Sequence, residues 1–511
     1  MPAPREPVPR EPVPRELSTT DCFDTVITRG LGEPRQVHYV VARRLRQDGL
    51  LAAGAEEYVE ARERAEHLAR SRRGPGRTSD DVAREVVALL DLPADAAPAV
   101  AAAEMDAELA LTRAVPGAAA LLAAERARGA RLGFLSDTPM TAGQLRLLLE
   151  RCGLIVEGDL VWTSSDLAAE KGEGEAYAAV VADLGGRPGR WLHRGDNRRS
   201  DVLMARLSGV EGSWAPAAAL TGDERRLDRA APATGGLSSV LAGASRRARL
   251  LLAEDGDADP RAGAVTGVLA PLLVGYALWA LHRCAADPPA ALRVTGPGSG
   301  VLLDVLTPLA AVVAPGLELR DDGAPAADEL VLHSPGSTTG AGLHLVRTDD
   351  GTEQGVDPGP DDGAGARSGA WLRDDVAGTG SVEAGVEAAL LVAALAREPH
   401  PGVVLAAREA APLLALLPWS ADLRGPVLAV AERLRTAPTP AEARAWALVP
   451  GTPAWPAARA AARSGAARTA ARAAARSRGA GRLLRHKATR GGVLLRGRLA
   501  APRPRGEDGT G

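Results

Sequence analysis

The feature that most constrains the fold is a series of short apolar segments that alternate with stretches of helical periodicity over the first 215 residues. Three of these segments carry a polar residue at or just after their end: Leu17–Cys22 contains Asp21, Arg131–Ser136 ends in a hydroxyl, and Trp191–Gly195 precedes Asp196. Strands that alternate with helices form a parallel sheet, and ligands bind at the carboxyl ends of its strands. The sequence therefore predicts a three-layer α/β domain over residues 17–215, with its polar strand ends at one crevice.

Helical spacing also fills the interval between the first two strands. Apolar residues recur every three to four positions in four segments, which are Val37–Leu50, Ala53–Arg70, Ser79–Leu90 and Ala99–Ala114. We expect residues 30–115 to form a helical cap over the crevice, since a cap excludes water during group transfer. A further strand is expected at Leu160–Thr163, with helices at Thr141–Cys152, Gly174–Leu184 and Ser200–Leu207.

Four polar motifs follow one another along this domain. They are Asp21-Cys22-Phe23-Asp24-Thr25, Ser136 at a strand end, Lys171 at the start of a helical pattern, and Asp196-Asn197 with Asp201. In this order they resemble the four motifs of the haloacid dehalogenase-like (HAD) hydrolase superfamily, whose fold is a Rossmann-like parallel sheet with a cap. The first motif is similar to that of a subgroup reading Phe-Asp-x-Phe-Asp-Thr, which often accompanies cell-surface polysaccharide genes.

The resemblance implies a magnesium site at the crevice. Asp21 would be the nucleophile that forms an aspartyl-phosphate, and it would also bind Mg²⁺. The backbone carbonyl of Phe23 and the carboxylate of Asp196 would be further ligands, with Asp201 as a ligand or a support for one. Oxygen ligands of this kind suit magnesium.

The resemblance also assigns the groups that bind the phosphoryl oxygens. Ser136 would donate a hydrogen bond, and Lys171 would neutralise the nucleophile and the developing charge. The chain has 61 basic residues but only two lysines, Lys171 and Lys487. A compact ammonium suits a tight site better than a guanidinium does, which explains a lysine at this position.

The first motif departs from the superfamily pattern. Phosphatases of the superfamily place a second aspartate two residues after the nucleophile, where it protonates the leaving group. Here that position is Phe23, and the acid comes one residue later, at Asp24. Adjacent side chains at a strand end point in different directions, so we expect Asp24 to bind backbone amides of the following turn rather than to act as the acid.

These observations predict a magnesium-dependent hydrolase, in first place a phosphatase of a phosphorylated small molecule or sugar, connected with surface glycan assembly. The alternative is a binding or scaffold protein that keeps the fold without strong catalysis. A further alternative is binding of an anionic polymer by the basic C-terminal tail. Residues 456–511 contain 14 Arg and Lys against Glu507 and Asp508, but no interleaved aromatic residues, so we do not predict nucleic acid as the partner.

Three widely spaced cysteines favour neither disulfides nor a zinc site, and a cytoplasmic location fits best. Residues 1–16 lack the apolar core of a signal peptide and are expected to be a disordered Pro/Arg/Glu arm. Residues 216–260 are rich in Ala, Gly and charge, which predicts a linker with one helix. Residues 263–281 contain no charge, but glycines and a proline favour a buried helix over a membrane span.

Residues 261–455 predict a second α/β domain of unknown function. Its expected strands are Leu292–Thr295, Leu317–Arg320, Glu329–His333 and Leu343–Arg347, and its expected helices are Val301–Val313, Ser381–Arg397 and Leu423–Arg435. Gly296–Gly300 follows the first of these strands. It resembles a nucleotide-binding loop only weakly, and an ordinary strand-to-helix turn explains it as well.

Overall fold

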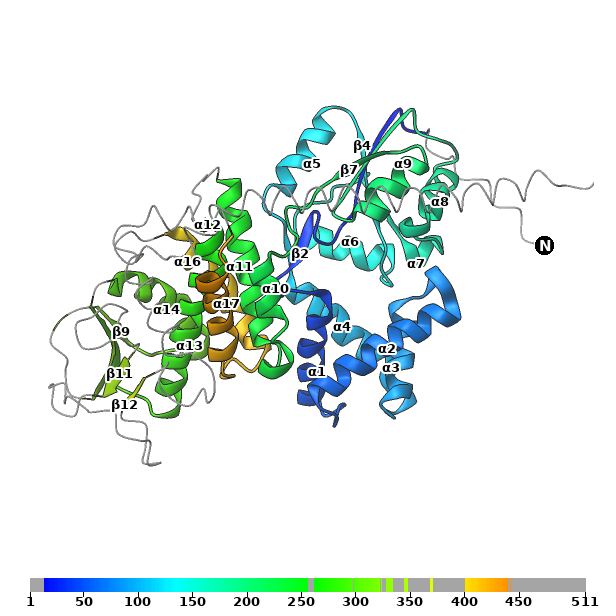
Figure 1. Ribbon diagram of the computed structural model, residues 1–511. Coiled ribbons are helices and arrows are strands. Elements are labelled where there is room, and N and C mark those ends of the chain that lie inside the picture. The colour runs from blue at the N-terminus through cyan, green and yellow to red at the C-terminus, as the bar shows by residue number, and fades with distance from the viewer. Residues whose placement is uncertain are drawn as a thin grey trace, which may run out of the picture.

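The computed structural model describes residues 13–255, 262–296, 298–321, 323, 328–333, 344–347, 368–370, 400–439 and 442. These residues form two five-stranded sheets and one two-stranded sheet, with helices around them. Figure 1 shows the N-terminal sheet and the cap on one side and the second α/β part on the other, with helices α10 and α11 between them.

The N-terminal sheet has the strand order β5-β4-β1-β6-β7, and every neighbouring pair is parallel. Its strands are β1 (Glu16–Thr20), β4 (Arg131–Ser136), β5 (Leu160–Thr163), β6 (Arg190–Gly195) and β7 (Glu211–Trp214). Chain order reverses between β1 and β6, which is the point where open parallel sheets bind their ligands. Asp21 follows β1 directly, so it lies at this point.

Helices cover both faces of this sheet. They are α5 (Ala118–Ala127), α6 (Ala142–Arg151), α7 (Ser164–Leu167), α8 (Glu175–Asp183) and α9 (Ala205–Leu207). Neighbouring residues of β4 belong to different apolar clusters: Phe134 packs with Leu145 on one face, and Leu135 packs with Tyr177 and Trp191 on the other. Successive side chains of a strand point to opposite faces, so both faces are buried and the predicted three-layer α/β fold is confirmed.

The cap is a four-helix insert between β2 (Ile27–Arg29) and β3 (Thr112–Ala114), which pair antiparallel. Its helices are α1 (Val37–Gln47), α2 (Ala55–Arg73), α3 (Ser79–Leu89) and α4 (Ala97–Leu111). The prediction that the last helix runs to Ala114 is wrong, because the helix ends at Leu111 and Thr112–Ala114 form strand β3. Thr112 is β-branched and leaves the helix to pair with Arg29, where ladder hydrogen bonds replace the last helical turn.

Residues 216–260 differ from the linker that we predicted. They contain α10 (Gly222–Asp228) and α11 (Leu237–Glu254), and every residue of α11 from Leu237 to Arg246 is buried. The small residues that suggested a linker instead let this helix approach its neighbours closely. The sequence Ser-Ser-Val-Leu-Ala-Gly-Ala-Ser thus forms a packed surface.

The apolar segment that follows is helical from Ala262 to Ala286, as α12 (Ala262–Ala264), a π-helical stretch (Val265–Leu269) and α13 (Ala270–Ala286). Among the described residues it is the one helix long and apolar enough to cross a membrane, and 94% of its most apolar window is buried inside the protein. Packing against α11, α14 (Ser299–Val313), α16 (Pro401–Ala410) and α17 (Arg424–Thr436) accounts for its composition.

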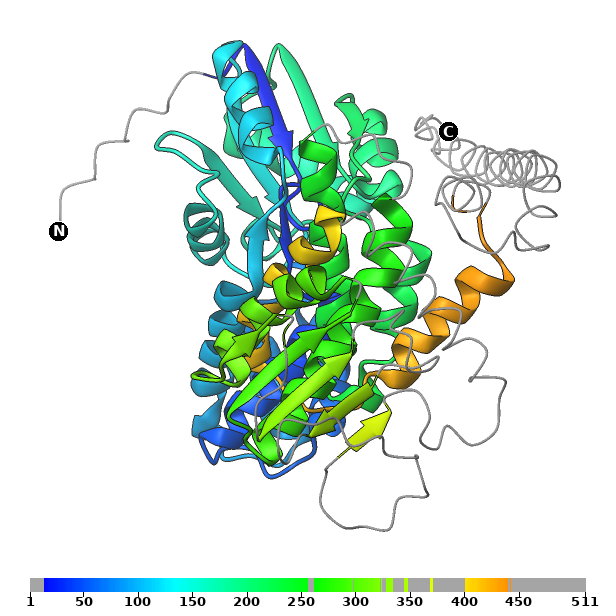
Figure 2. The same cartoon turned by 90° about the vertical axis from the view of Figure 1, so that its left-hand side faces the viewer.

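The second sheet has the order β12-β11-β10-β8-β9. Figure 2 shows its strands beside the helical layer. Strands β8 (Ala291–Thr295), β9 (Leu319–Arg320) and β10 (Glu329–His333) are parallel, whereas β11 (His344–Arg347) and β12 (Ser368–Ala370) are antiparallel. The predicted helix at Ser381–Arg397, most of the N-terminal arm and the tail at residues 456–511 lie outside the described residues.

Candidate active site

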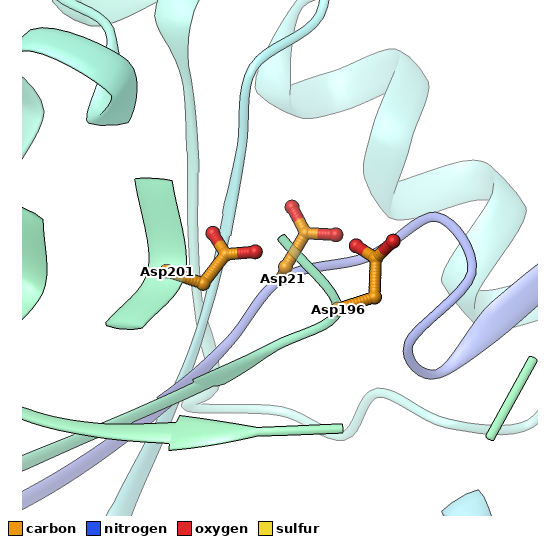
Figure 3. A group of neighbouring side chains, drawn as sticks. All are labelled: Asp21, Asp196 and Asp201. Atoms are coloured by element: carbon orange, nitrogen blue, oxygen red, sulfur yellow. The ribbon is translucent and has the colours of Figure 1, made fainter. Parts of the chain in front are cut away.

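Two strand ends and the helical stretch that follows the second bring the predicted carboxylates together. The backbone N–H of Asp21 donates to the carbonyl oxygen of Arg194 at 2.7 Å, which fixes the end of β1 against β6. Asp196 follows β6, and Asp201 lies in the π-helical stretch Arg198–Met204 behind it. Figure 3 shows the three carboxylates side by side, and one oxygen from each lies within 4.8 Å of the others.

Lys171 joins two of these carboxylates. Its Nζ donates to Asp21 Oδ1 at 2.5 Å and to Asp201 Oδ1 at 2.8 Å, and its side chain is 2% exposed. Burial alone would lower the pKa of Lys171, but Asp21, Asp201 and Asp137 raise it well above its usual value, so the amine is charged. Asp137 also accepts the backbone N–H of Lys171 at 3.1 Å, which holds this residue in place.

Asp201 is a support more than a free ligand, because both of its oxygens are engaged. Oδ2 accepts the Asn197 N–H at 2.9 Å, and Oδ1 accepts from Lys171 and from Ser200 Oγ at 3.2 Å. Burial opposes ionisation, yet hydrogen bonds from His193 and Lys171 hold the pKa of Asp201 well below its usual range. A Cβ on Gly195 would lie 2.3 Å from the Asp201 carboxylate, so this position requires glycine.

A bound cation would stabilise the ionised forms of Asp21 and Asp196, because the pKa values of both carboxyl groups are raised. Burial raises the pKa of Asp21 to about 7, against the attraction of Lys171 and with the repulsion of Asp201. Burial, followed by repulsion from Asp24 and Asp201, raises the pKa of Asp196 to about 6. Three neighbouring carboxylates with one ammonium, which binds two of them, leave negative charge uncompensated, and a hard divalent cation with oxygen ligands fits that surplus.

Ser136 lies at the end of β4, next to β1, and is 2% exposed. The structure therefore brings it to the same edge of the sheet as Asp21, as predicted from the sequence. Its role as a donor to a phosphoryl oxygen and the role of the Phe23 carbonyl as a metal ligand stay predictions.

The ring of Phe23 faces the cavity under the cap and lies beside Arg29, so this position offers no group for proton transfer. The Arg29 guanidinium carbon lies 4.0 Å from the centroid of the Phe23 ring. Arg29 is itself held by Glu108 of α4, with Nε to Oε2 at 2.8 Å and Nη2 to Oε1 at 2.7 Å. The position that carries an acid in superfamily phosphatases is thus part of an aromatic and ionic contact with the cap.

Asp24 does not bind backbone amides, contrary to our prediction. Its Oδ1 accepts from Thr28 Oγ1 at 2.8 Å and from Arg246 Nη1 of α11 at 2.9 Å. The residue has a left-handed backbone conformation with φ of 55°, which aspartate tolerates better than most residues. A carboxylate oxygen that is fixed by a hydroxyl and a guanidinium braces the turn and is poorly suited to carry protons.

A cavity of about 550 Å³ lies between the cap and the core. Its volume falls within the range of roughly 300–1,000 Å³ that is usual for small-molecule sites. Phe23, Arg29 and Asp137 line it from the core, and Val37, His38, Met105 and Glu108 from the cap. Two other lining arginines are already paired: Arg62 with Glu66 and Glu104, and Arg77 with Glu66 and Glu170.

Several residues at the site were not predicted from the sequence. His193, which is fully buried on β6, links Thr19 to Asp201 through distances of 2.8 Å and 3.3 Å. Burial lowers the pKa of His193 to about 4, so the ring is neutral. Arginines are common in this chain, and nothing in their spacing distinguishes Arg29 or Arg246 before the fold is known.

The fold and the site together define a class of protein. It has a parallel α/β domain with a helical cap, and carboxylates that follow two of its strands lie near a buried lysine. Residues 19–209 match the family model described as haloacid dehalogenase-like hydrolase. This match supports the resemblance to the HAD-like hydrolase superfamily that the motifs predicted for this part of the chain.

Similar solved structures cover 39% of this chain. A 2-haloacid dehalogenase from Pseudomonas syringae is 19% identical, with 85% of its chain covered and a TM-score of 0.31. A putative HAD-hydrolase from Bacillus subtilis bound to magnesium is 18% identical, with 88% covered and a TM-score of 0.31. A HAD phosphatase from Thermococcus onnurineus is 24% identical, with 85% covered and a TM-score of 0.27. A comparison with curated proteins found no match.

Proposed function

We propose that this protein is a magnesium-dependent phosphohydrolase that transfers a phosphoryl group to Asp21. The observation that carries the proposal is the cluster of three carboxylates at the edge of the sheet, two of which bind one buried ammonium. Asp21 and Asp196 would hold a magnesium ion, which supplies positive charge for the phosphoryl oxygens when bound. Asp201 would keep Lys171 in position beside them.

In the proposed reaction each of these residues has a separate role. Asp21 attacks phosphorus, and the bond from phosphorus to the leaving oxygen breaks. Lys171 and Ser136 stabilise the negative charge on the phosphoryl oxygens. Water then hydrolyses the aspartyl-phosphate and releases inorganic phosphate.

The contacts of Phe23 and Asp24 indicate that general acid catalysis is weak in this protein. Phe23 carries no proton, and Asp24 is engaged by Thr28 and Arg246. Loss of acid–base help typically costs about 10²- to 10⁴-fold in rate. We therefore propose that the enzyme prefers esters whose leaving group needs no proton, such as aryl phosphates or acyl phosphates, over alkyl phosphates.

A second candidate reaction is hydrolysis of a carbon–halogen bond, and Phe23 is the observation that favours it. A halide leaves without a proton, so the missing acid would be no handicap. The acidic cluster argues against it, because a haloacid requires no divalent cation and Asp196 would then be a half-buried carboxylate without a cation bound to it. The third hypothesis is a scaffold protein, in which the crevice binds a phosphate ester but does not hydrolyse it.

The test is one turnover screen with three groups of substrates in the presence of magnesium: aryl phosphates, alkyl phosphates and short 2-haloacids. We expect phosphate release from aryl phosphates, loss of that release in Asp21→Asn, and a modest fall in Asp24→Asn. Halide release would favour the second candidate. Retention of magnesium binding without turnover of any ester would contradict the phosphatase proposal and favour a scaffold.

The biological setting is a proposal as well. The cavity between cap and core is of small-molecule size and has several charged side chains in its lining, which supports a phosphorylated small molecule or sugar as substrate. The link to surface glycan assembly and the cytoplasmic location rest on the first-motif resemblance and on the free cysteines Cys22, Cys152 and Cys284.

A further inference from the structure

Helix α11 lies against both connections between the cap and the core. The first connection, residues 30–36, runs from β2 to α1, and the second, residues 112–115, runs from α4 back to the core. These are the only two points at which the chain enters and leaves the cap. Figure 1 places α11 beside β2 and next to the start of α1.

One buried guanidinium binds the first connection and the nucleophile turn together. Arg246 of α11 is 1% exposed. Its Nη2 donates to the carbonyl oxygens of Arg29 at 2.9 Å and Leu31 at 2.7 Å, and its Nη1 donates to Asp24 at 2.9 Å. Because a guanidinium is a rigid planar fork, its two nitrogens fix these partners relative to each other.

Other residues of α10 and α11 hold the same connection. The Gly32 N–H donates to Ser239 Oγ at 2.8 Å, and the Glu33 N–H donates to Asp228 Oδ1 at 3.1 Å. The backbones also touch, because a Cβ on Gly243 would lie 2.1 Å from the Gly30 carbonyl oxygen. The first connection is therefore packed against the helix over several consecutive residues and is not free to pivot.

The second connection is held by the same helix. Arg247, the neighbour of Arg246, donates through Nη1 to the Ala114 carbonyl oxygen, and its Nε binds Glu409 of α16 at 3.1 Å. Glu254 near the end of α11 accepts the Gly117 N–H at 2.9 Å. Two adjacent arginines thus bind the two connections, and one of them extends the contact to α16.

We propose that α11 fixes the position of the cap over the crevice and that Arg246 is a positioning residue for the nucleophile turn. The cap moves only when the contacts of Arg246 and Arg247 break or when α11 moves with it. Because α11 packs on α13 and α16, a change in the second α/β part reaches the cap through this helix. Asp24 then has a defined role, which is to connect the Asp21 turn to Arg246.

The experiment compares Arg246→Met with Arg249→Met in the full-length protein. Arg249 lies on the same helix and also forms an ion pair, with Glu224 at 2.9 Å, but it contacts neither connection. Hydrogen–deuterium exchange of residues 27–36 reports on the first connection. Turnover of p-nitrophenyl phosphate and magnesium binding report on the crevice.

We expect both variants to lose stability, but only Arg246→Met to speed exchange of residues 27–36, by about tenfold or more. It should also lower kcat by about 10- to 100-fold with KM changed little, because a displacement of about 1 Å in a reacting group costs up to about 100-fold. Magnesium binding should be retained. Equal exchange and equal kcat in the two variants would overturn the proposal.

A second variant guards against misfolding of Arg246→Met. Ser239→Ala removes the acceptor of the Gly32 N–H with little change in volume, and it should speed exchange of the same segment. Unchanged exchange in Ser239→Ala, together with an unfolded Arg246→Met, would count against the proposal. The kinetic measurement rests on the proposed phosphatase activity, whereas the exchange measurement does not, so failure of one is distinguishable from failure of the other.

Discussion

Replacement of Lys171 by methionine should separate the electrostatic role of this residue from its packing role. Methionine is close in length and fills the space, but it removes the charge. The two partners lie at 2.5 Å and 2.8 Å from Nζ, and the exposed fractions of Lys171, Asp201 and Asp21 are 2%, 1% and 11%. Solvent therefore screens neither ion pair.

Removal of one partner from a buried ion pair typically costs about 3–5 kcal/mol of folding free energy, because the remaining charge loses its compensation. We expect Lys171→Met to fall in this range in the absence of magnesium. Loss of one preorganised charge at the transition state should lower kcat by about 10²- to 10³-fold, which equals about 2.7–4 kcal/mol. Lys171→Arg should not restore activity, since the guanidinium is too large for this site.

Urea denaturation and turnover of p-nitrophenyl phosphate measure the two effects. Arg190→Met is the control, because the Arg190–Glu211 pair also joins a cation to a carboxylate but has exposed fractions of 60% and 56%. Exposed pairs contribute little to stability because solvent screens them, so this variant should be nearly unchanged. A loss of less than about 1 kcal/mol in Lys171→Met, with turnover within about threefold of the parent, would refute the assigned role of Lys171.

Three further outcomes follow from the same geometry. Asp196→Ala should abolish magnesium binding in calorimetry, whereas Asp95→Ala, at an exposed position on the cap, should leave it unchanged; equal binding in both would remove Asp196 from the site. Asp21→Asn should abolish phosphate release while the protein keeps its fold, because an amide is not a nucleophile here, and any residual release above background would argue against Asp21 as the attacking group. Burial, together with Arg62, Arg29 and Arg35, holds the pKa of His38 well below 6.5, so the folded protein keeps this ring neutral while the unfolded chain protonates it. The stability that His38 contributes is therefore present above pH 6.5 and lost as the pH falls. As the pH falls from about 7.5 to about 5.5, the parent should lose more stability in urea denaturation than His38→Gln does, and His67→Gln, at an exposed position, is the matched control.

The sequence predicted the residues whose chemistry is tied to a strand end. Asp21, Ser136 and Asp196 follow apolar segments, and the carboxyl ends of parallel strands must share one edge, so their meeting follows from the topology. Lys171 was conspicuous because lysine is rare in this chain. The strands and helices of the N-terminal domain were also predicted, because the periodicity of apolar residues depends on the local secondary structure.

The contacts that depend on distant segments could not be predicted. Arg246 reaches Asp24 across 222 positions, and no local pattern reports such a pair. The small residues around Gly243 suggested a linker, because composition does not distinguish a flexible segment from a helix that packs closely. Likewise, the partners of Asp24 are side chains brought in by the fold, whereas the sequence pointed only to its neighbouring amides.

The most direct test of the central claim is mass spectrometry of the protein quenched during turnover of an aryl phosphate with magnesium. Because neither Phe23 nor Asp24 is placed to activate water, hydrolysis of the intermediate should be slow, and phosphate should accumulate on the peptide that contains Asp21. We predict a burst of phenol release of about one equivalent and one phosphoryl group on Asp21. Turnover without any covalent phosphate, or a phosphoryl group on another residue, would contradict the account.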